Sequence, residues 1–211
     1  SVLGDGPEHC GKTVVKDIGL ERFSQIDHPG QEGSEAVGDT SRVKVYQWRE
    51  AVGKKRGSHK YSHGHALVLS GGHGNTGAAR LAARGALRIG AGLVTLGSPR
   101  SAMFENAANL TAVMLRQIDG ALGLKELLED ARFSAVCLGP GLGIRADTQA
   151  MVLTVLKENQ PTVLDADALT RFSAKPEVLF DVLHKDCVNT PHGGEFARLF
   201  PDIAKRLDAP A

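Results

Sequence analysis

The chain has 211 residues, 42% of them hydrophobic, and its 25 basic and 24 acidic side chains nearly cancel. This composition is typical of a soluble globular protein, and the balanced charge argues against a nucleic-acid partner or an acidic membrane surface. Since no apolar run has the length of a membrane-spanning helix and no signal-peptide pattern opens the chain, we expect no membrane partner. The three cysteines, Cys10, Cys137 and Cys187, form no CxxC pair or disulfide framework, which favours the reducing cytoplasm.

The N-terminal part of the chain differs in character from the rest. Residues 1–24 contain a short strand-like run, TVVKDIGL, whereas residues 25–42 are polar, glycine-rich and without periodicity, as in a linker. We expect an ordered region from about Val43 to the end. The first residue is Ser rather than Met, which predicts a cut or processed chain.

Apolar runs and helical patterns alternate along the ordered region. This alternation predicts βαβ units, and therefore an α/β fold with a mostly parallel sheet and helices on both faces. Several runs are continuous rather than alternating, as in strands that are covered on both sides. The expected strands are 66–70, 93–97, 134–138, 162–165 and 187–190, and the expected helices lie near 76–90, 120–130 and 145–158.

The helix near 76–90 has two distinct faces on a helical wheel. Arg80, Arg84 and Arg88 share one face, which we expect to be solvated. The opposite face carries small and apolar residues, which would allow the helix to approach a sheet closely. We expect that face to be buried, and its members are Ala78, Leu81, Ala82, Gly85, Ala86 and Ile89.

The stretch ALVLSGGHGNTGAARLA, residues 66–82, joins a strand to this helix through a glycine cluster. Gly72, Gly74 and Gly77 spell G-x-G-x-x-G, and a helix N-terminus behind such a loop suits phosphates. A dinucleotide fingerprint also needs an acidic residue about 20 positions on, and the next strand ends in GSPR without one. Arg100 could suit a 2′-phosphate. Both a nucleotide cradle and a plain turn for close helix–sheet contact remain open.

Two further loops follow strands. CLGPGLG, residues 137–143, is either a rigid loop whose backbone a ligand can approach closely or a plain turn. In TVLDADALT, Asp165 and Asp167 come where the apolar run stops, and they could hold Mg²⁺ or a ribose hydroxyl. Asp167 is also well placed to cap a helix that begins at Ala168. Asp165 is therefore the better functional candidate.

A fourth loop lies within VNTPHGGEFARLF, residues 188–200. His192 stands at a strand-to-helix corner, where it could hydrogen-bond an amide or phosphate of a ligand. Glu195 falls in the first turn of the next helix, where it could simply stabilise the turn. Because all four loops follow parallel strands, we expect them to line one crevice at the carboxyl ends of the sheet.

Histidines gather near the first expected strand. His63 and His65 are two residues apart and would share a strand face, with His59 and His73 nearby. A metal site would also need carboxylate or cysteine partners at fixed spacing, and the sequence contains no such pattern. We therefore assign no metal site to them.

Taken together, the motifs resemble those of the ADP- or ATP-dependent NAD(P)H-hydrate dehydratases, a family of ribokinase-like fold. The resemblance covers residues 48–211 as a partial dehydratase domain. Residues 1–24 look like the end of the NAD(P)H-hydrate epimerase domain that precedes the dehydratase in bifunctional repair enzymes, and residues 25–47 are then the linker. The matching stretches are KYSHG (60–64), SGGHGNTGAARLAARGALRIGAGLVTL (70–96), GPGLG (139–143), LDADAL (164–169) and TPHGGEFARL (190–199), with CGKTVVKDIGL (10–20) for the epimerase.

The resemblance implies a hydro-lyase that removes water from (S)-NAD(P)H-hydrate and consumes ADP or ATP, with Mg²⁺ as a candidate ion and epimerase activity in the parent chain. Phosphorylation of the hydroxyl would make it a good leaving group, and the ring nitrogen would then help to expel it. By resemblance, Ala78 and Gly141 contact the substrate through backbone and close approach, and His192 hydrogen-bonds it. Asn75, Asp165 and Glu195 would support these contacts.

The sequence also departs from the family. Gly193 stands in TPHGGE where the family usually has proline. The family continues into a Lys-Gly turn that binds the adenine nucleotide and a Gly-Thr-Gly-Asp or Gly-Ser-Gly-Asp loop with the catalytic aspartate, whereas this sequence stops at AKRLDAPA. The catalytic residues of the epimerase are absent as well. We therefore expect a central fragment of a bifunctional enzyme, with its catalytic aspartate beyond Ala211 and no activity by itself.

Two other functions remain open. A ribokinase-like kinase of a vitamin precursor would share the fold, although the GPGLG and TPHGGE loops favour the dehydratase. A non-catalytic nucleotide-binding module or a truncated gene product would account for the missing second half. The resemblance further implies a homo-oligomer and favours ADP as the phosphate donor.

Overall fold

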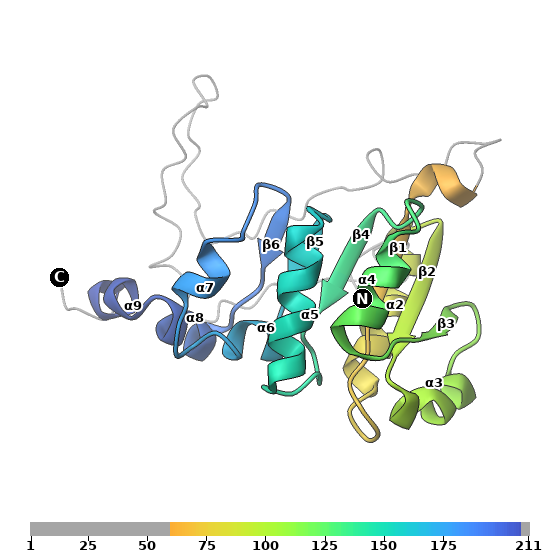
Figure 1. Cartoon of the computed structure of the whole chain (residues 1–211), viewed down its shortest axis with the longest axis horizontal. Coiled ribbons are helices and arrows are strands. Elements are labelled where there is room, and N and C mark those ends of the chain that lie inside the picture. The colour runs from red at the N-terminus through yellow and green to blue at the C-terminus, as the bar shows by residue number, and fades with distance from the viewer. Residues whose placement is uncertain (1–59, 208–211) are drawn as a thin grey trace, which may run out of the picture. The chain divides into compact units, whose positions relative to one another are not determined.

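The computed structural model describes residues 60–207, and within them six strands form one parallel sheet (Figure 1). The strand order is β3-β2-β1-β4-β5-β6, and all five neighbouring pairs are parallel. This arrangement confirms the expected α/β fold. The strands are β1 (His65–Leu69), β2 (Leu93–Ser98), β3 (Met114–Gln117), β4 (Ala135–Leu138), β5 (Thr162–Leu164) and β6 (Cys187–Asn189).

Helices connect these strands. In the described part of the chain, no helix is long and apolar enough to cross a membrane. Two short 3₁₀ helices, η2 (Lys60–His63) and η3 (Arg100–Ala102), precede β1 and α3. The α-helices are α2 (Gly77–Ile89), α3 (Met103–Asn109), α4 (Gly120–Leu128), α5 (Ala146–Lys157), α6 (Asp167–Thr170), α7 (Glu177–Phe180), α8 (Gly193–Leu199) and α9 (Pro201–Leu207).

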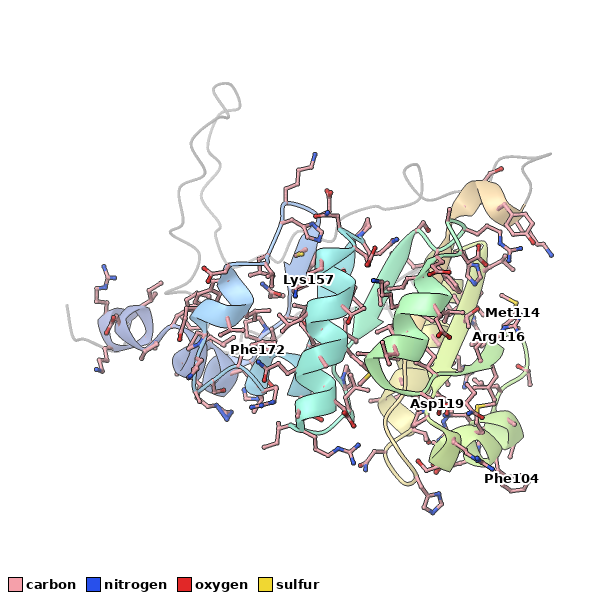
Figure 2. The ribbon with its side chains drawn as sticks, viewed as in Figure 1. Phe104, Met114, Arg116, Asp119, Lys157 and Phe172 are labelled. Atoms are coloured by element: carbon pink, nitrogen blue, oxygen red, sulfur yellow. The ribbon has the colours of Figure 1, made fainter. Side chains whose placement is uncertain are left out.

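Both faces of the sheet are covered. Successive residues of β1 alternate between two apolar clusters: Leu67 and Leu69 belong to the larger cluster, and Val68 belongs to the smaller one. The larger cluster packs beneath α4 and α5, which Figure 1 shows in front of the sheet, and includes Phe172, labelled in Figure 2. The smaller cluster packs against α2. Burial on both faces explains why the strands read as continuous apolar runs.

The five strands and three helices expected from the sequence are present, with bounds that agree within about two residues. The edge strand β3 and the helices α3, α7 and α9 were not expected. His63 lies in η2 rather than in β1, and Gly64 with φ +73° separates it from His65, so the two histidines do not share a strand face. The epimerase end at 1–24, the linker at 25–47 and the ordered region from Val43 to residue 59 lie outside the described residues.

The expected buried face of α2 was only partly correct: Ala82 and Ala86 pack against the smaller cluster, whereas Ala78, Leu81, Gly85 and Ile89 are exposed. Leu81 and Ile89 are 70% and 57% exposed, and a Cβ on Gly85 would meet nothing within 4 Å. Ala79 and Ala83 are buried against the sheet instead. The buried face lies one residue further along the helix than expected. The residues of α2 that pack against the valine and leucine side chains of β1 and β2 are Ala79, Ala82, Ala83, Ala86 and Leu87.

Candidate functional site

The strand order places the candidate site at the carboxyl ends of the strands, next to β1 and β4. The chain adds β2 and β3 on one side of β1 and then returns to the other side of β1 for β4. In open parallel sheets, ligands bind outside the carboxyl ends of the strands where the order reverses in this way. The first loop, residues 70–76 after β1, and the second loop, residues 139–145 after β4, flank this point.

The first and second loops touch backbone to backbone. A Cβ on Gly71 would overlap the carbonyl oxygen of Gly141, and a Cβ on Gly141 would lie 2.6 Å from the carbonyl oxygen of Asn75. Gly141 also has φ +73°, which glycine adopts without the steric cost that other residues meet. Close approach of the two loops therefore requires glycine at both positions. It also brings together two predicted residues, Asn75 and Gly141, with the side chain of Asn75 exposed.

Of the three glycines in the G-x-G-x-x-G match, only Gly74 is required by its backbone conformation, with φ +78°. A Cβ would meet nothing within 4 Å at Gly74 or Gly77, and only the Ser101 hydroxyl at 3.6 Å at Gly72. In the dinucleotide fingerprint, the third glycine allows close helix–strand packing, and Gly77 has no such neighbour. The match therefore lacks both the packing and the acidic residue of that fingerprint. Gly71, outside the match, is the glycine that close contact with the second loop requires.

The second loop also meets the third loop, residues 165–167 after β5. A Cβ on Gly139 would overlap the carbonyl oxygen of Asp165, and the Gly143 N–H donates to Asp167 Oδ2 over 2.8 Å. The expectation that Asp167 caps the next helix was wrong. The helix α6 begins at Asp167 itself, Ala166 occupies the cap position, and no side chain caps it. The Asp167 carboxylate instead accepts from a loop amide, which needs a partner because it belongs to no helix or strand.

Asp165 links the third loop to the fourth, residues 190–192 after β6. The Thr190 hydroxyl donates to Asp165 Oδ1 over 2.8 Å, and the Thr190 N–H donates to the carbonyl oxygen of Leu164 over 3.0 Å. Burial raises the pKa of the Cys137 thiol on β4, and the negative charge of Asp165 raises it further. The structure thus joins the four predicted loops into one continuous band across β1, β4, β5 and β6.

His192 and Glu195 form a capping box at the start of α8. The Gly194 N–H donates to His192 Nδ1 over 3.0 Å, and the His192 N–H donates to Glu195 Oε2 over 3.0 Å. The interpretation of Glu195 as a residue that stabilises the turn is confirmed, and its side chain is buried. Because Nδ1 accepts a hydrogen bond, this pattern assigns the proton of the neutral ring to Nε2, which lies 3.3 Å from Glu195 Oε1. The imidazole is 66% exposed, so a ligand can reach the ring, where it would compete with Glu195 for the Nε2 donor.

Ala78 is exposed in the first turn of α2, directly behind the first loop. Three strand spacings separate β1 from β6, so about 14 Å lies between the ends of the strands that lead to Ala78 and His192. The structure therefore does not bring these two residues into contact. A ligand that touches both must be extended across the carboxyl ends of the strands, from β1 to β6.

A small hollow opens beside the first loop at the carboxyl ends of β1 and β2. Its lining combines apolar side chains, such as Leu69, Leu142 and Met151, with the charged side chains of Arg145 and Asp147, as in sites for small molecules. Among residues 60–207, no group of three His, Cys, Asp or Glu side chains is arranged to hold a metal ion. The residues that line the hollow are Leu69, Ser70, Gly71, Gly72, Gly97, Pro99, Ile118, Gly120, Leu142, Arg145, Asp147 and Met151.

Two residues of α3 that the sequence did not point to hold the first loop. The Glu105 carboxylate accepts from the Gly74 N–H over 2.9 Å and from the Thr76 hydroxyl over 2.5 Å. These bonds, led by the one from Gly74, hold the pKa of Glu105 below its ordinary value. Asn106 is fully buried and donates to the hydroxyls of Ser70 and Ser98. No local pattern in the sequence links Glu105 or Asn106 to a loop about 30 residues earlier.

Comparison with known proteins gives a consistent result. Residues 66–210 match the family described as NAD(P)H-hydrate dehydratase. The chain is 34% identical over 205 residues to the bifunctional NAD(P)H-hydrate repair enzyme Nnr of Synechocystis sp., which covers 92% of this chain and 37% of that protein. It is 35% identical over 147 residues to the ADP-dependent (S)-NAD(P)H-hydrate dehydratase of Lactococcus lactis, which covers 69% of this chain and 52% of that protein. The chain thus spans between about a third and a half of these relatives.

Solved structures show the same fold. The ADP/ATP-dependent NAD(P)H-hydrate dehydratase of Bacillus subtilis, co-crystallized with ATP/Mg²⁺, aligns with a TM-score of 0.57 at 29% identity, over 73% of this chain and 53% of that one. A ribokinase-like superfamily protein of Enterococcus faecalis aligns with a TM-score of 0.58 at 24% identity, over 69% of this chain and 51% of that one. The expected ribokinase-like fold is confirmed.

Proposed function

We propose, for a chain that belongs to the NAD(P)H-hydrate dehydratase family, that its strand-end loops bind a hydrated nicotinamide dinucleotide during ADP- or ATP-dependent dehydration. The observation that carries this proposal is the continuous band of four loops at the carboxyl ends of β1, β4, β5 and β6. The bonds from Gly143 to Asp167 and from Thr190 to Asp165 hold the band together. In open α/β sheets, nucleotides bind outside the carboxyl ends of the strands.

The span of the band favours a dinucleotide over a compact ligand. Ala78 and Gly141 offer backbone at the β1–β4 reversal, while His192 offers an Nε2 donor about 14 Å along the edge. Ala78 carries only a methyl group and Gly141 has no side chain, so a ligand can approach both backbones closely. Asn75, Asp165 and Glu195 hold or flank these contacts. One extended molecule could therefore use all three.

The chemistry that we propose is loss of water from the hydrated ring. Transfer of a phosphoryl group from ADP or ATP to the ring hydroxyl turns it into a leaving group. The lone pair of the ring nitrogen then expels phosphate, and the ring loses a proton, which restores the reduced nicotinamide. The described residues bind and orient the dinucleotide in this scheme.

Magnesium fits the described residues only together with the nucleotide. The two candidate ligands, Asp165 and Asp167, already accept hydrogen bonds from different neighbours, Thr190 and Gly143. Mg²⁺ in such sites is bound through one or two carboxylates and the phosphates of the substrate. The remaining carboxylate oxygens of these two residues could supply the protein ligands of the ion.

We also propose that the activity of the parent chain includes epimerisation of the hydrate.

Binding of NADPH to the full chain tests the proposal. At a ligand concentration about 100 times Kd, bound NADPH would stabilise the fold by about 2.7 kcal/mol and raise Tm by roughly 5–10 °C. Hydroxyethylthiazole and hydroxymethylpyrimidine, as precursors for vitamin kinases, serve as controls and should cause no shift. A shift with a vitamin precursor and none with NADPH would instead identify a kinase of the same fold.

Two variants of His192 separate binding from capping. Serine at this position can form the usual capping box with Glu195, so His192→Ser should keep the stability of α8. His192→Ala loses the cap and should cost about 1 kcal/mol. Both variants should bind NADPH more weakly than the unaltered chain. Unchanged NADPH affinity in His192→Ser would exclude His192 as a ligand contact.

Self-association belongs to the same proposal. The outward face of α2 presents Leu81, Gly85 and Ile89, and such an apolar stripe is suited to a second copy of the chain. Sedimentation velocity should show an oligomer that Leu81→Glu dissociates; a monomeric unaltered chain would refute it.

We also propose the cytoplasm as the location, supported by the free thiols of Cys137 and Cys187.

A further inference from the structure

The side chain of Asn106 attaches helix α3 to the sheet through hydrogen bonds. Its Nδ2 donates to the Ser98 hydroxyl over 2.9 Å and to the Ser70 hydroxyl over 3.1 Å. These serines lie at the carboxyl ends of β2 and β1, and all three side chains are buried. On the opposite side of the helix, Phe104 is 87% exposed and points away from the protein in Figure 2. The helix therefore has one fixed orientation on the sheet.

This orientation directs the neighbouring residue, Glu105, to the first loop. Its carboxylate takes one hydrogen bond from the backbone of Gly74 and one from the side chain of Thr76, the two residues on either side of Asn75. His73 Nδ1 lies 3.1 Å from the same carboxylate. Thr76 is fully buried at the cap position of α2, and Ala78 follows two residues later.

We propose that Glu105 is a positioning residue for the dinucleotide, because its carboxylate fixes the backbone of the first loop and the start of α2 against which the ligand lies. This inference rests on the proposed function. The position of Asn75 decides where its carbonyl oxygen meets Gly141, so Glu105 also sets the distance between the first and second loops. A glycine-rich loop has many open conformations, and an acceptor from outside the loop restricts them.

Three variants of the full chain test this inference. Glu105→Ala removes both acceptors. Glu105→Gln keeps the amide oxygen for Gly74, and its NH₂ group can donate to the Thr76 hydroxyl, so it should rescue most of the effect. Glu126→Ala makes the same substitution as Glu105→Ala at an exposed glutamate of α4, and it serves as the matched control.

Two measurements are needed on each variant. The first is hydrogen exchange of the amides in residues 72–78, which reports on the loop without any ligand. The second is the Kd of NADPH by calorimetry at a temperature where circular dichroism shows every variant to be folded. We expect Glu105→Ala to exchange these amides at least about ten times faster and to bind NADPH about ten- to hundred-fold more weakly, the factor for one charge-assisted hydrogen bond.

The outcomes separate this inference from the proposed function. Unchanged exchange in Glu105→Ala, or NADPH affinity within about two-fold of the unaltered chain, would overturn the role of Glu105 while leaving the proposed function intact. An equal loss in Glu126→Ala would also overturn it. If the unaltered chain itself gives no NADPH signal, the proposed function fails, and the positioning role for a dinucleotide fails with it. Faster loop exchange and weaker binding confined to Glu105→Ala would support the inference.

Discussion

The contact between the first and second loops makes a prediction at Gly141. Gly141 and Gly143 share one glycine-rich loop and have nearly equal backbone angles, φ +73° and +77°. An alanine at either position would pay about 1–2 kcal/mol for a left-handed backbone conformation. The two positions differ in their surroundings, since a Cβ at 141 would lie 2.6 Å from the Asn75 carbonyl oxygen and one at 143 only 3.8 Å from Arg145 Nε.

The expected difference follows from that contact. At Gly143 the added methyl finds space, so Gly143→Ala should cost only the backbone term. At Gly141 the backbone of the first loop must also move, and overpacking of this kind costs about 1–3 kcal/mol more. The effect of alanine on the unfolded chain is the same for both variants and cancels in the comparison.

Urea unfolding provides the assay. A difference of about 2 kcal/mol between the variants, with a slope of about 2 kcal/mol per molar urea, should separate their midpoints by about 1 M. Gly141→Ala should also weaken NADPH binding more than Gly143→Ala does, because it separates the two loops. Free energies of unfolding that agree within about 0.5 kcal/mol would refute the reasoning, since the loops would then not be in backbone contact.

Four further predictions follow from the described residues. Gly85→Ala should raise the free energy of unfolding by about 1 kcal/mol, because Gly85 lies inside α2 with open space around it; an unchanged urea midpoint would contradict this. Gly193→Pro should raise Tm, because Gly193 opens α8 and His192 is already extended at φ −72° and ψ 168°; a lower Tm would show that the Gly193 N–H is needed. Glu195→Ala should cost about 1–3 kcal/mol by leaving the His192 N–H without its acceptor, and Glu195→Gln should cost less in the same urea titration. Burial lowers the pKa of His65, so the unfolded chain binds a proton first as pH falls below about 6.5; stability should decrease there by at most about 1.4 kcal/mol per pH unit, and His65→Gln should remove the slope.

The sequence predicted the parts of the fold that are coded by local pattern. Strands such as β1 and β4 are buried on both faces, so each appears in the sequence as a continuous apolar run. The sequence of β3 contains no such apolar run, because the strand lies at the edge of the sheet and Met114, Arg116 and Gln117 are exposed. The α3 sequence, MFENAAN, has no apolar period because most of the helix is in contact with solvent.

Within the site, the sequence predicted residues but not their partners. The loops after β1, β4, β5 and β6 were identifiable because glycine, aspartate and histidine follow apolar runs. Which loops are neighbours depends on strand order, and strand order is set by packing between segments far apart in the chain. Asp167 shows the consequence. A local rule predicted that it caps a helix, whereas its carboxylate accepts a hydrogen bond from the Gly143 N–H in the loop after the adjacent strand.

The composition of the first loop gives a physical reason for the residues that the sequence did not indicate. Backbone contact with the second loop requires glycine at position 71, and glycine loses more conformational freedom on folding than any other residue. A loop built in this way has few side chains with which to hold itself, so its order must come from elsewhere in the fold. The crossover after β2 passes the same end of the sheet and supplies Asn106 for the strand ends and Glu105 for the loop. The need for close backbone approach thus accounts both for the glycines that the sequence shows and for the buried polar anchor on α3 that it conceals.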